Sequence, residues 1–239
     1  MTVIEQTDRA LAVAANQFAG RSIVLDKLVH DIIVTALPTG GVLIAALCWI
    51  WFETDETGVH SGRRNVVTGL LAVMVVAGAV WLLKALLPFR DRPLNDPDLG
   101  LQVPFGVDPI SVNALSAIPS GHTAFFFALS VPLWRRSRWL GAAAAIWTSL
   151  TICLPLLYRG EHWPSDIVVG AMVGVALMLL LCRLIGATRL PDRIVRFGAT
   201  HAPVFYAIAW LIALEMAQMF DGVQAYFRDA ARLARALVS

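Results

Sequence analysis

The sequence predicts an all-α polytopic membrane protein, a six-transmembrane-helix bundle with an N-terminal amphipathic helix. Of its 239 residues, 58% are hydrophobic and only 15% are charged, whereas soluble domains average about 45–50% apolar and about 25% charged residues. The mean hydropathy is +0.69. Several apolar runs also approach the roughly 20 residues that a membrane helix needs. The net charge of +2 is too small to indicate a nucleic-acid partner.

Residues 1–30 are predicted to form an amphipathic segment on the membrane surface. Apolar side chains recur there at near-helical intervals, at Ile4, Leu11, Ala15 and Phe18. The segment has no basic stretch leading into an apolar core, so we expect no cleaved signal peptide. Residues 31–239 are predicted to form the membrane domain.

Six spans are predicted in the membrane domain, at 32–52, 66–87, 120–134, 139–158, 167–184 and 203–220. The third is long enough only if it begins near Ser120 and the arginines at 135–138 extend to the interface. The connection 89–118 is rich in aspartate, proline and glycine, which indicates an irregular loop or lid. The stretch "GAMVG" at 170–174 is typical of a helix-packing face.

The short loops predict the orientation, because cytoplasmic loops carry an excess of lysine and arginine. Loops 1–2, 3–4 and 5–6 hold eight arginines, and the opposite loops are offset by acidic residues. We therefore expect a bacterial inner-membrane protein with both termini on the periplasmic or outer side. Three polar clusters, "KALLPFRDRP", "PSGH" and "YRGEHWPSD", are then brought together at this outer surface.

Each cluster has a reading as part of a phosphoryl-transfer site. Cations at the first cluster would bind phosphate oxygens, and the glycine and serine that open a helix would present N–H groups to an anion. His162 could attack phosphorus while Asp166 holds its other ring nitrogen, and His122 could protonate the leaving oxygen. The candidate phosphate-binding residues are Lys84, Arg90, Arg92, Ser120, Gly121 and Arg159. No carboxylate set suited to Mg²⁺ is evident, so we expect no metal and no cofactor.

Each cluster taken alone also fits a structural interpretation. Lys84 and Arg92 could extend to the interface from a helix end, and "PSGH" could be an ordinary turn before a helix. Asp166 could cap a helix behind Pro164. The coincidence of all three clusters at one surface favours the catalytic interpretation.

The order and content of these motifs resemble the type-2 phosphatidic acid phosphatase superfamily, the lipid phosphate phosphatases. That family carries K-x6-R-P, then P-S-G-H, then S-R-x5-H-x3-D, on a six-helix membrane core. "PSGH" matches at 119–122, and "HWPSD" supplies H-x3-D. The resemblance implies that His162 is the nucleophile, Asp166 its partner and His122 the acid. It also implies that Lys84, Arg92, Ser120 and Gly121 bind phosphate.

The chain departs from the family pattern in two places. Seven residues, not six, separate Lys84 from the following Arg-Pro, and one extra residue turns a regular helix by about 100°. The Ser-Arg pair of the third motif is replaced by Pro155 and Leu156. Arg159, three residues before His162, is predicted to supply the missing guanidinium.

The predicted function is removal of phosphate from a lipid phosphate or diphosphate at the outer membrane face, through a phosphohistidine. The resemblance does not choose among undecaprenyl diphosphate, phosphatidylglycerol phosphate, phosphatidic acid and lipid A phosphates. One alternative is a phosphotransferase that passes the same phosphate to another lipid. A second is a non-catalytic lipid-binding or transport protein. The expected partners are the substrate and membrane lipids, and the sequence specifies no oligomeric state.

Overall fold

A computed structural model describes residues 2–53, 59–107 and 116–219, and the regular elements in these ranges are all helical. The N-terminal half contains α1 (Val3–Asn16), α2 (Ile23–Val34), the π turn η1 (Leu37–Gly41), α3 (Val42–Phe52) and α4 (Val59–Leu86). Two short 3-10 turns follow, η2 (Pro93–Asn95) and η3 (Pro97–Leu99). The C-terminal half contains α5 (Gly121–Arg136), α6 (Arg138–Thr148), the π turn η5 (Ser149–Cys153), α7 (Leu154–Tyr158), α8 (Pro164–Gly186), α9 (Leu190–Thr200) and α10 (Ala202–Ala217).

Among the described residues, three continuous helical stretches are long and apolar enough to cross a membrane, at His60–Leu86, Arg138–Tyr158 and Pro164–Gly186. A fourth is present if α2 and η1–α3, which meet at a bend of 57°, are taken as one span. The prediction of a helical membrane protein is therefore confirmed, and the count of six spans stays a prediction. The predicted last span is seen as the shorter α10, and its final residue, 220, lies outside the described ranges.

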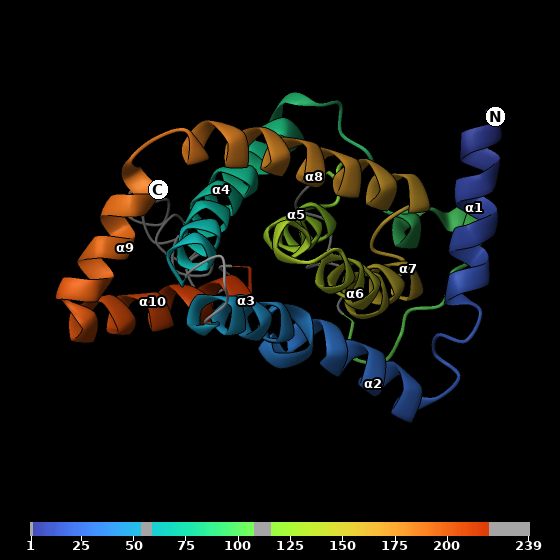
Figure 1. The fold of residues 1–239 in the computed structure, drawn as a ribbon. Coiled ribbons are helices and arrows are strands. Elements are labelled where there is room, and N and C mark those ends of the chain that lie inside the picture. Colours follow the sequence, from blue (N-terminus) through green and yellow to red (C-terminus); the bar gives the residue numbers. More distant parts are fainter. Residues whose placement is uncertain (1, 54–58, 108–115, 220–239) are drawn as a thin grey trace, which may run out of the picture.

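Helix α5 lies at the centre of the bundle, with α3, α4, α6 and α8 packed around it (Figure 1). Its side chains Phe125, Phe126 and Leu129 are fully buried. Large apolar side chains on other helices instead face outward, among them Trp81 on α4, Met172 on α8 and Trp210 on α10. Such surfaces are costly in water, and a bilayer accommodates them.

The N-terminal segment, predicted as one amphipathic helix, consists of two helices. The chain breaks between α1 and α2, where Gly20 adopts a φ of +71° that suits glycine. Ile4, Leu11 and Phe18 are exposed, and the buried residues of α1 are Asp8, Ala12 and Asn16. The helix therefore turns a partly polar face to the protein and leaves apolar side chains free for lipid.

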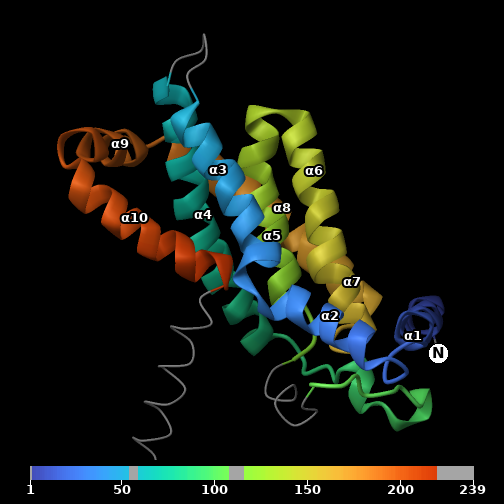
Figure 2. The same cartoon turned by 90° about the horizontal axis from the view of Figure 1, so that it is seen from below.

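The two ends of the bundle carry different segments (Figure 2). One end holds the α5–α6 turn and α9, where Arg64 pairs with Asp192 at 3.0 Å and Arg136 with Glu53 at 2.8 Å. The other end holds α1, α2, the 93–107 loop and the start of α8. The loops predicted to share one side therefore do lie at one end, and which membrane face that end meets stays a prediction.

Candidate active site

The start of α8 places His162 and Asp166 together. Gly160 turns the chain with a φ of +64°, and Pro164 opens the helix in the position where its missing N–H costs nothing. Three residues then separate His162 from Asp166, a spacing of i to i+4 that brings the two side chains close together. His162 is 2% exposed and Asp166 is fully buried.

The imidazole and the carboxylate face one another without a hydrogen bond. His162 Nδ1 lies 3.6 Å from Asp166 Oδ2, beyond hydrogen-bonding distance, and Nδ1 has no other partner among the described residues. Catalytic hydrogen bonds are often long before substrate binds. A shift of about half an ångström would close this one, and the pair then leaves Nε2 as the nitrogen available for chemistry.

The surroundings of His162 keep its ring neutral. Burial lowers the pKa of His162, because the interior disfavours the charged imidazolium. The nearby positive charges of Arg92 and Lys84 also lower it, and Asp166 opposes them. A neutral imidazole retains the lone pair that a nucleophile needs.

The "PSGH" segment forms the start of α5 and lies against α8. The Ser120 N–H donates to the Asp166 carbonyl at 3.1 Å, and the Ser120 hydroxyl accepts from the Thr123 N–H. The serine therefore caps the helix and joins it to the turn that carries His162 and Asp166. The N–H groups of Gly121 and His122 remain as first-turn donors for an anion.

Two glycines of "GAMVG" set the distance between α5 and α8. A Cβ on Gly170 would lie 2.6 Å from the Ser120 carbonyl oxygen, and one on Gly174 would lie 2.1 Å from that of Ala124. Only glycine permits such approach. The packing role predicted for this stretch is therefore seen in the structure, and it holds the two histidine-bearing elements together.

Lys84 and Arg92 reach the same site from the end of α4 and the loop that follows. A Cβ on Gly121 would lie 3.8 Å from the Lys84 ammonium nitrogen, so this charge lies beside the start of α5. Arg92 donates to the Glu161 carbonyl at 3.2 Å. Helix α4 ends at Leu86, so the extra residue before Arg-Pro is absorbed in the loop and does not turn Lys84 away.

Arg159 belongs to the same group of cations. It is largely buried, it contacts His30 Nδ1 at 3.2 Å, and its charge acts on both His122 and Arg92. Its Nε lies 2.6 Å from Glu161 Oε1, yet neither atom has an aligned hydrogen bond. We therefore describe this contact as an ion pair. Leu156, at the position of the family's arginine, is fully buried in the apolar core.

Arg90, also predicted to bind phosphate, has its guanidinium engaged elsewhere. It donates to Asp166 Oδ1 at 2.6 Å, to Ser165 Oγ at 2.8 Å and to Asp8 Oδ2 at 2.7 Å. It also lies over the Trp163 ring. Asp8 is not among the candidate site residues predicted from the sequence. The one signal that could have indicated it is the position of a carboxylate on a predicted amphipathic helix.

A cavity of about 160 Å³ opens beside His122. Its walls come mainly from Ile33 and Val34 of α2, Phe126 of α5, and Ala217 and Met219 at the end of α10. His122 is thus placed between a cluster of cations and a cavity whose lining is mixed, with Thr39 and Gln218 beside the apolar side chains. Within the described ranges, no group of three or more His, Cys, Asp or Glu residues is arranged to hold a metal ion.

Comparison with known proteins shows the family and the fold. The profile of the PAP2 superfamily matches residues 66–190. A candidate undecaprenyl-diphosphatase, YbjG of Escherichia coli K12, is 27% identical over 145 residues, which cover 60% of this chain and 63% of that protein. A crystal structure of a PAP2-type phosphatidylglycerolphosphate phosphatase from Bacillus subtilis superposes with a TM-score of 0.50 at 17% identity, over 79% of this chain and 90% of that one. At this identity the likeness concerns the fold.

Proposed function

The chain belongs to the PAP2 superfamily, and from this premise we propose that it is a membrane phosphatase acting on a lipid phosphate or diphosphate through a phosphohistidine at His162. The observation that carries the proposal is the buried pair of His162 Nδ1 and Asp166 Oδ2, 3.6 Å apart, beside the charges of Lys84 and Arg92. A site that only binds a lipid phosphate has no need of an oriented, neutral imidazole.

The reaction proceeds in two steps. In the first, His162 Nε2 attacks phosphorus and the bond from phosphorus to the lipid oxygen breaks. His122, protonated once the anionic phosphate lies beside it, gives that oxygen a proton. In the second, His122 takes a proton from water, which attacks the phosphohistidine and releases inorganic phosphate and free His162. Lys84, Arg92, Arg159 and the N–H groups of Gly121 and His122 stabilise the charge on the phosphoryl oxygens.

The cavity beside His122 supports the direction of the first step. The apolar part of its mixed lining, formed by Ile33, Val34 and Phe126, would contact the first carbons of the lipid and so place the leaving oxygen next to His122. The cations already supply the charge that a metal ion would otherwise provide. We therefore expect phosphate release to continue in EDTA and without an added cofactor. We also expect the reaction to take place at the outer membrane face.

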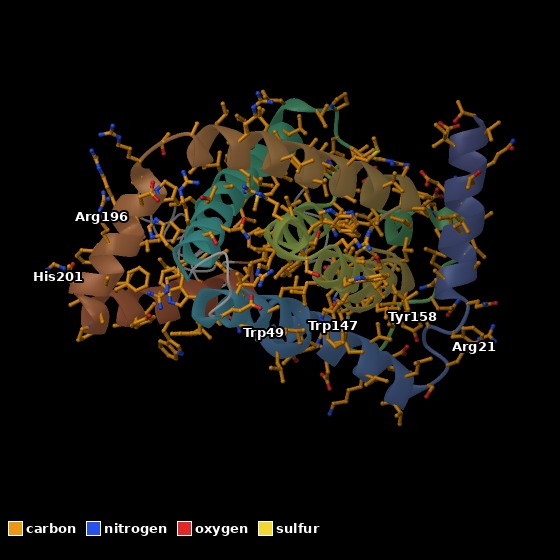
Figure 3. All side chains as sticks on the ribbon, viewed as in Figure 1. Arg21, Trp49, Trp147, Tyr158, Arg196 and His201 are labelled. Carbon is orange, nitrogen blue, oxygen red and sulfur yellow. The ribbon has the colours of Figure 1, made fainter. Side chains whose placement is uncertain are left out.

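The test measures phosphate release by the purified protein in detergent. The panel contains undecaprenyl diphosphate, phosphatidylglycerol phosphate, phosphatidic acid and lipid A phosphate, each with and without a second lipid as acceptor. We expect His162→Ala to abolish turnover while substrate binding survives. His201→Ala is the matched control, because His201 is exposed between α9 and α10, at an outer end of the molecule (Figure 3).

Acid-labile, base-stable labelling of wild-type protein by ³²P-substrate, lost in His162→Ala, would support the intermediate. Undiminished turnover in His162→Ala would remove the mechanism. Transfer of label to the acceptor lipid in preference to water would identify a phosphotransferase that uses the same histidine.

A further inference from the structure

Asp8 is a buried carboxylate on a helix that exposes its larger apolar side chains. It is 3% exposed, while Val3, Ile4 and Leu11 on the same helix lie at the surface. Burial of a carboxylate is costly unless charged or hydrogen-bonding groups surround it. The partners of Asp8 therefore decide what this part of α1 does.

Those partners are Ser165, which precedes Asp166 in the chain, and Arg90, which binds Asp166. Asp8 Oδ2 accepts from Arg90 Nη2 at 2.7 Å and from the Ser165 hydroxyl at 2.5 Å. Asp8 Oδ1 accepts from the Ser165 N–H at 2.9 Å. Arg90 Nη1 binds Asp166 Oδ1 at 2.6 Å. One guanidinium thus bridges the carboxylate of α1 and the carboxylate of the dyad.

This bridge sets the orientation of Asp166 towards His162. Asp166 Oδ1 is held by Arg90, and Oδ2 accepts from the Trp163 N–H at 2.8 Å. It is Oδ2 that faces His162 Nδ1. A displaced Arg90 would rotate the carboxylate and lengthen this approach. Asp8 also offsets part of the positive charge of Arg90. The carboxylate of Asp166 is then less fully neutralised by Arg90 and stabilises the imidazolium of His162 more strongly.

We propose that Asp8 is a positioning residue that acts through Arg90 to orient Asp166, which makes the N-terminal helix part of the catalytic machinery. The inference rests on the proposed function, since it assigns Asp8 a role towards the His162–Asp166 pair. It differs from simple anchoring of α1, because other contacts already perform that task.

Two such anchors lie away from the dyad. Asn16 donates to the carbonyls of Gln102 and Tyr158, both at 2.9 Å. Arg9 pairs with Asp96 in the loop at 2.8 Å. Arg9 is the residue next to Asp8 on the same helix, so Arg9→Gln removes an anchor of α1 without touching Arg90. It is the matched control.

The experiment compares Asp8→Asn with Arg9→Gln in the full-length protein. We expect Asp8→Asn to lower kcat about 10- to 100-fold, with KM within about threefold of wild type, as for loss of a group that acts in the transition state. Arg9→Gln should leave kcat within about twofold. The melting temperatures of the two variants in detergent should be similar.

The pH profile supplies a second readout. His162 faces Asp166, Arg92, Lys84 and His122. Loss of the Asp8 charge, and of the orientation of Asp166, both disfavour the imidazolium. The acid limb of kcat/KM should therefore move to lower pH in Asp8→Asn and stay in place in Arg9→Gln. An unmoved limb in Asp8→Asn would contradict the proposal.

A double-mutant cycle tests the path through Arg90. In an Arg90→Gln background, Asp8→Asn should add almost nothing to the loss of kcat, and a fully additive loss would overturn the proposal. If Asp8→Asn does not fold, Asp8→Glu takes its place: reduced kcat at wild-type melting temperature supports the role, and unchanged kcat rejects it. An active His162→Ala protein would reject the proposed function itself. If turnover depends on His162 but is unchanged in Asp8→Asn, only the role of Asp8 is rejected.

Discussion

Glu161 shows at the residue scale how the site is held before substrate arrives. Its carboxylate lies 2.6 Å from Arg159 Nε and 3.9 Å from an Arg92 nitrogen. Two buried guanidiniums in one site repel each other, and an anion between them offsets that repulsion. A phosphoryl group carries the same kind of charge and would take over this role during the reaction.

Arg159 is the residue on which phosphate binding is expected to depend most strongly. We expect Arg159→Ala to lower kcat/KM about a hundredfold, because removal of one oxyanion donor typically costs about 2.7–4 kcal/mol. Arg159→Lys keeps the charge but loses the planar guanidinium, so its kcat/KM should lie between those of the wild type and Arg159→Ala. Steady-state kinetics on the preferred lipid substrate measure both effects.

The control for this pair is Arg21→Ala. Arg21 is exposed in the turn between α1 and α2 (Figure 3). The substitution Arg21→Ala should therefore leave kcat and KM unchanged. Near wild-type kcat/KM in both Arg159 variants would show that Arg159 only neutralises Glu161.

His162 leads to an expected pH dependence. The reactive form is the neutral imidazole, which is present above its pKa and is lost as the pH falls through it. Because burial lowers this pKa, the acid limb of kcat/KM should lie below the 6.5 of an ordinary histidine. Asp166→Asn removes the anion that favours the imidazolium and should move the limb lower still. An acid limb of kcat/KM at or above pH 6.5 that Asp166→Asn does not move would show that a group other than His162 titrates there.

At the scale of elements, the contact between α5 and α8 determines whether the two histidines meet. Gly174→Ala would place a Cβ 2.1 Å from the Ala124 carbonyl oxygen, so the helices must separate. Overpacking of this kind costs roughly 1–3 kcal/mol, and the melting temperature should fall. Gly170→Ala acts at Ser120 itself and should lower kcat more than its loss of stability explains.

Gly78→Ala in α4 is the comparison for both glycine variants. No heavy atom lies within 4 Å of a Cβ built at Gly78, so this substitution should change stability by no more than about 1 kcal/mol. A Gly174→Ala protein as stable and as active as Gly78→Ala would show that α5 and α8 can separate without consequence.

At the scale of the whole molecule, the prediction to test is which end faces the cytoplasm. In a background without native cysteines, His60→Cys and Asp98→Cys mark the two ends of the bundle, and both positions are exposed. We expect membrane-impermeant maleimide to label position 98 from the periplasm and position 60 only after the membrane is opened. The reverse pattern would move the chemistry to the cytoplasmic leaflet.

The sequence by itself determined the membrane class, the helical fold, the superfamily and the positions of His122, His162 and Asp166. These features depend on local composition and on short motifs, because a membrane helix needs a long apolar run and a catalytic turn needs particular neighbours. The start of α5 at Ser120 and the packing role of "GAMVG" were predicted for the same reason.

Only the tertiary structure decided what the surrounding charges do. Arg90 contacts Asp8 across 82 positions of the sequence and Asp166 across 76, and no local pattern specifies such pairs. Asp8, Asn16 and Asp26, on the two helices of the N-terminal segment, likewise have partners far away in the sequence, at Ser165, Tyr158 and Phe105. A buried charge is stable only where its partners converge in space, and that convergence is a property of the folded chain.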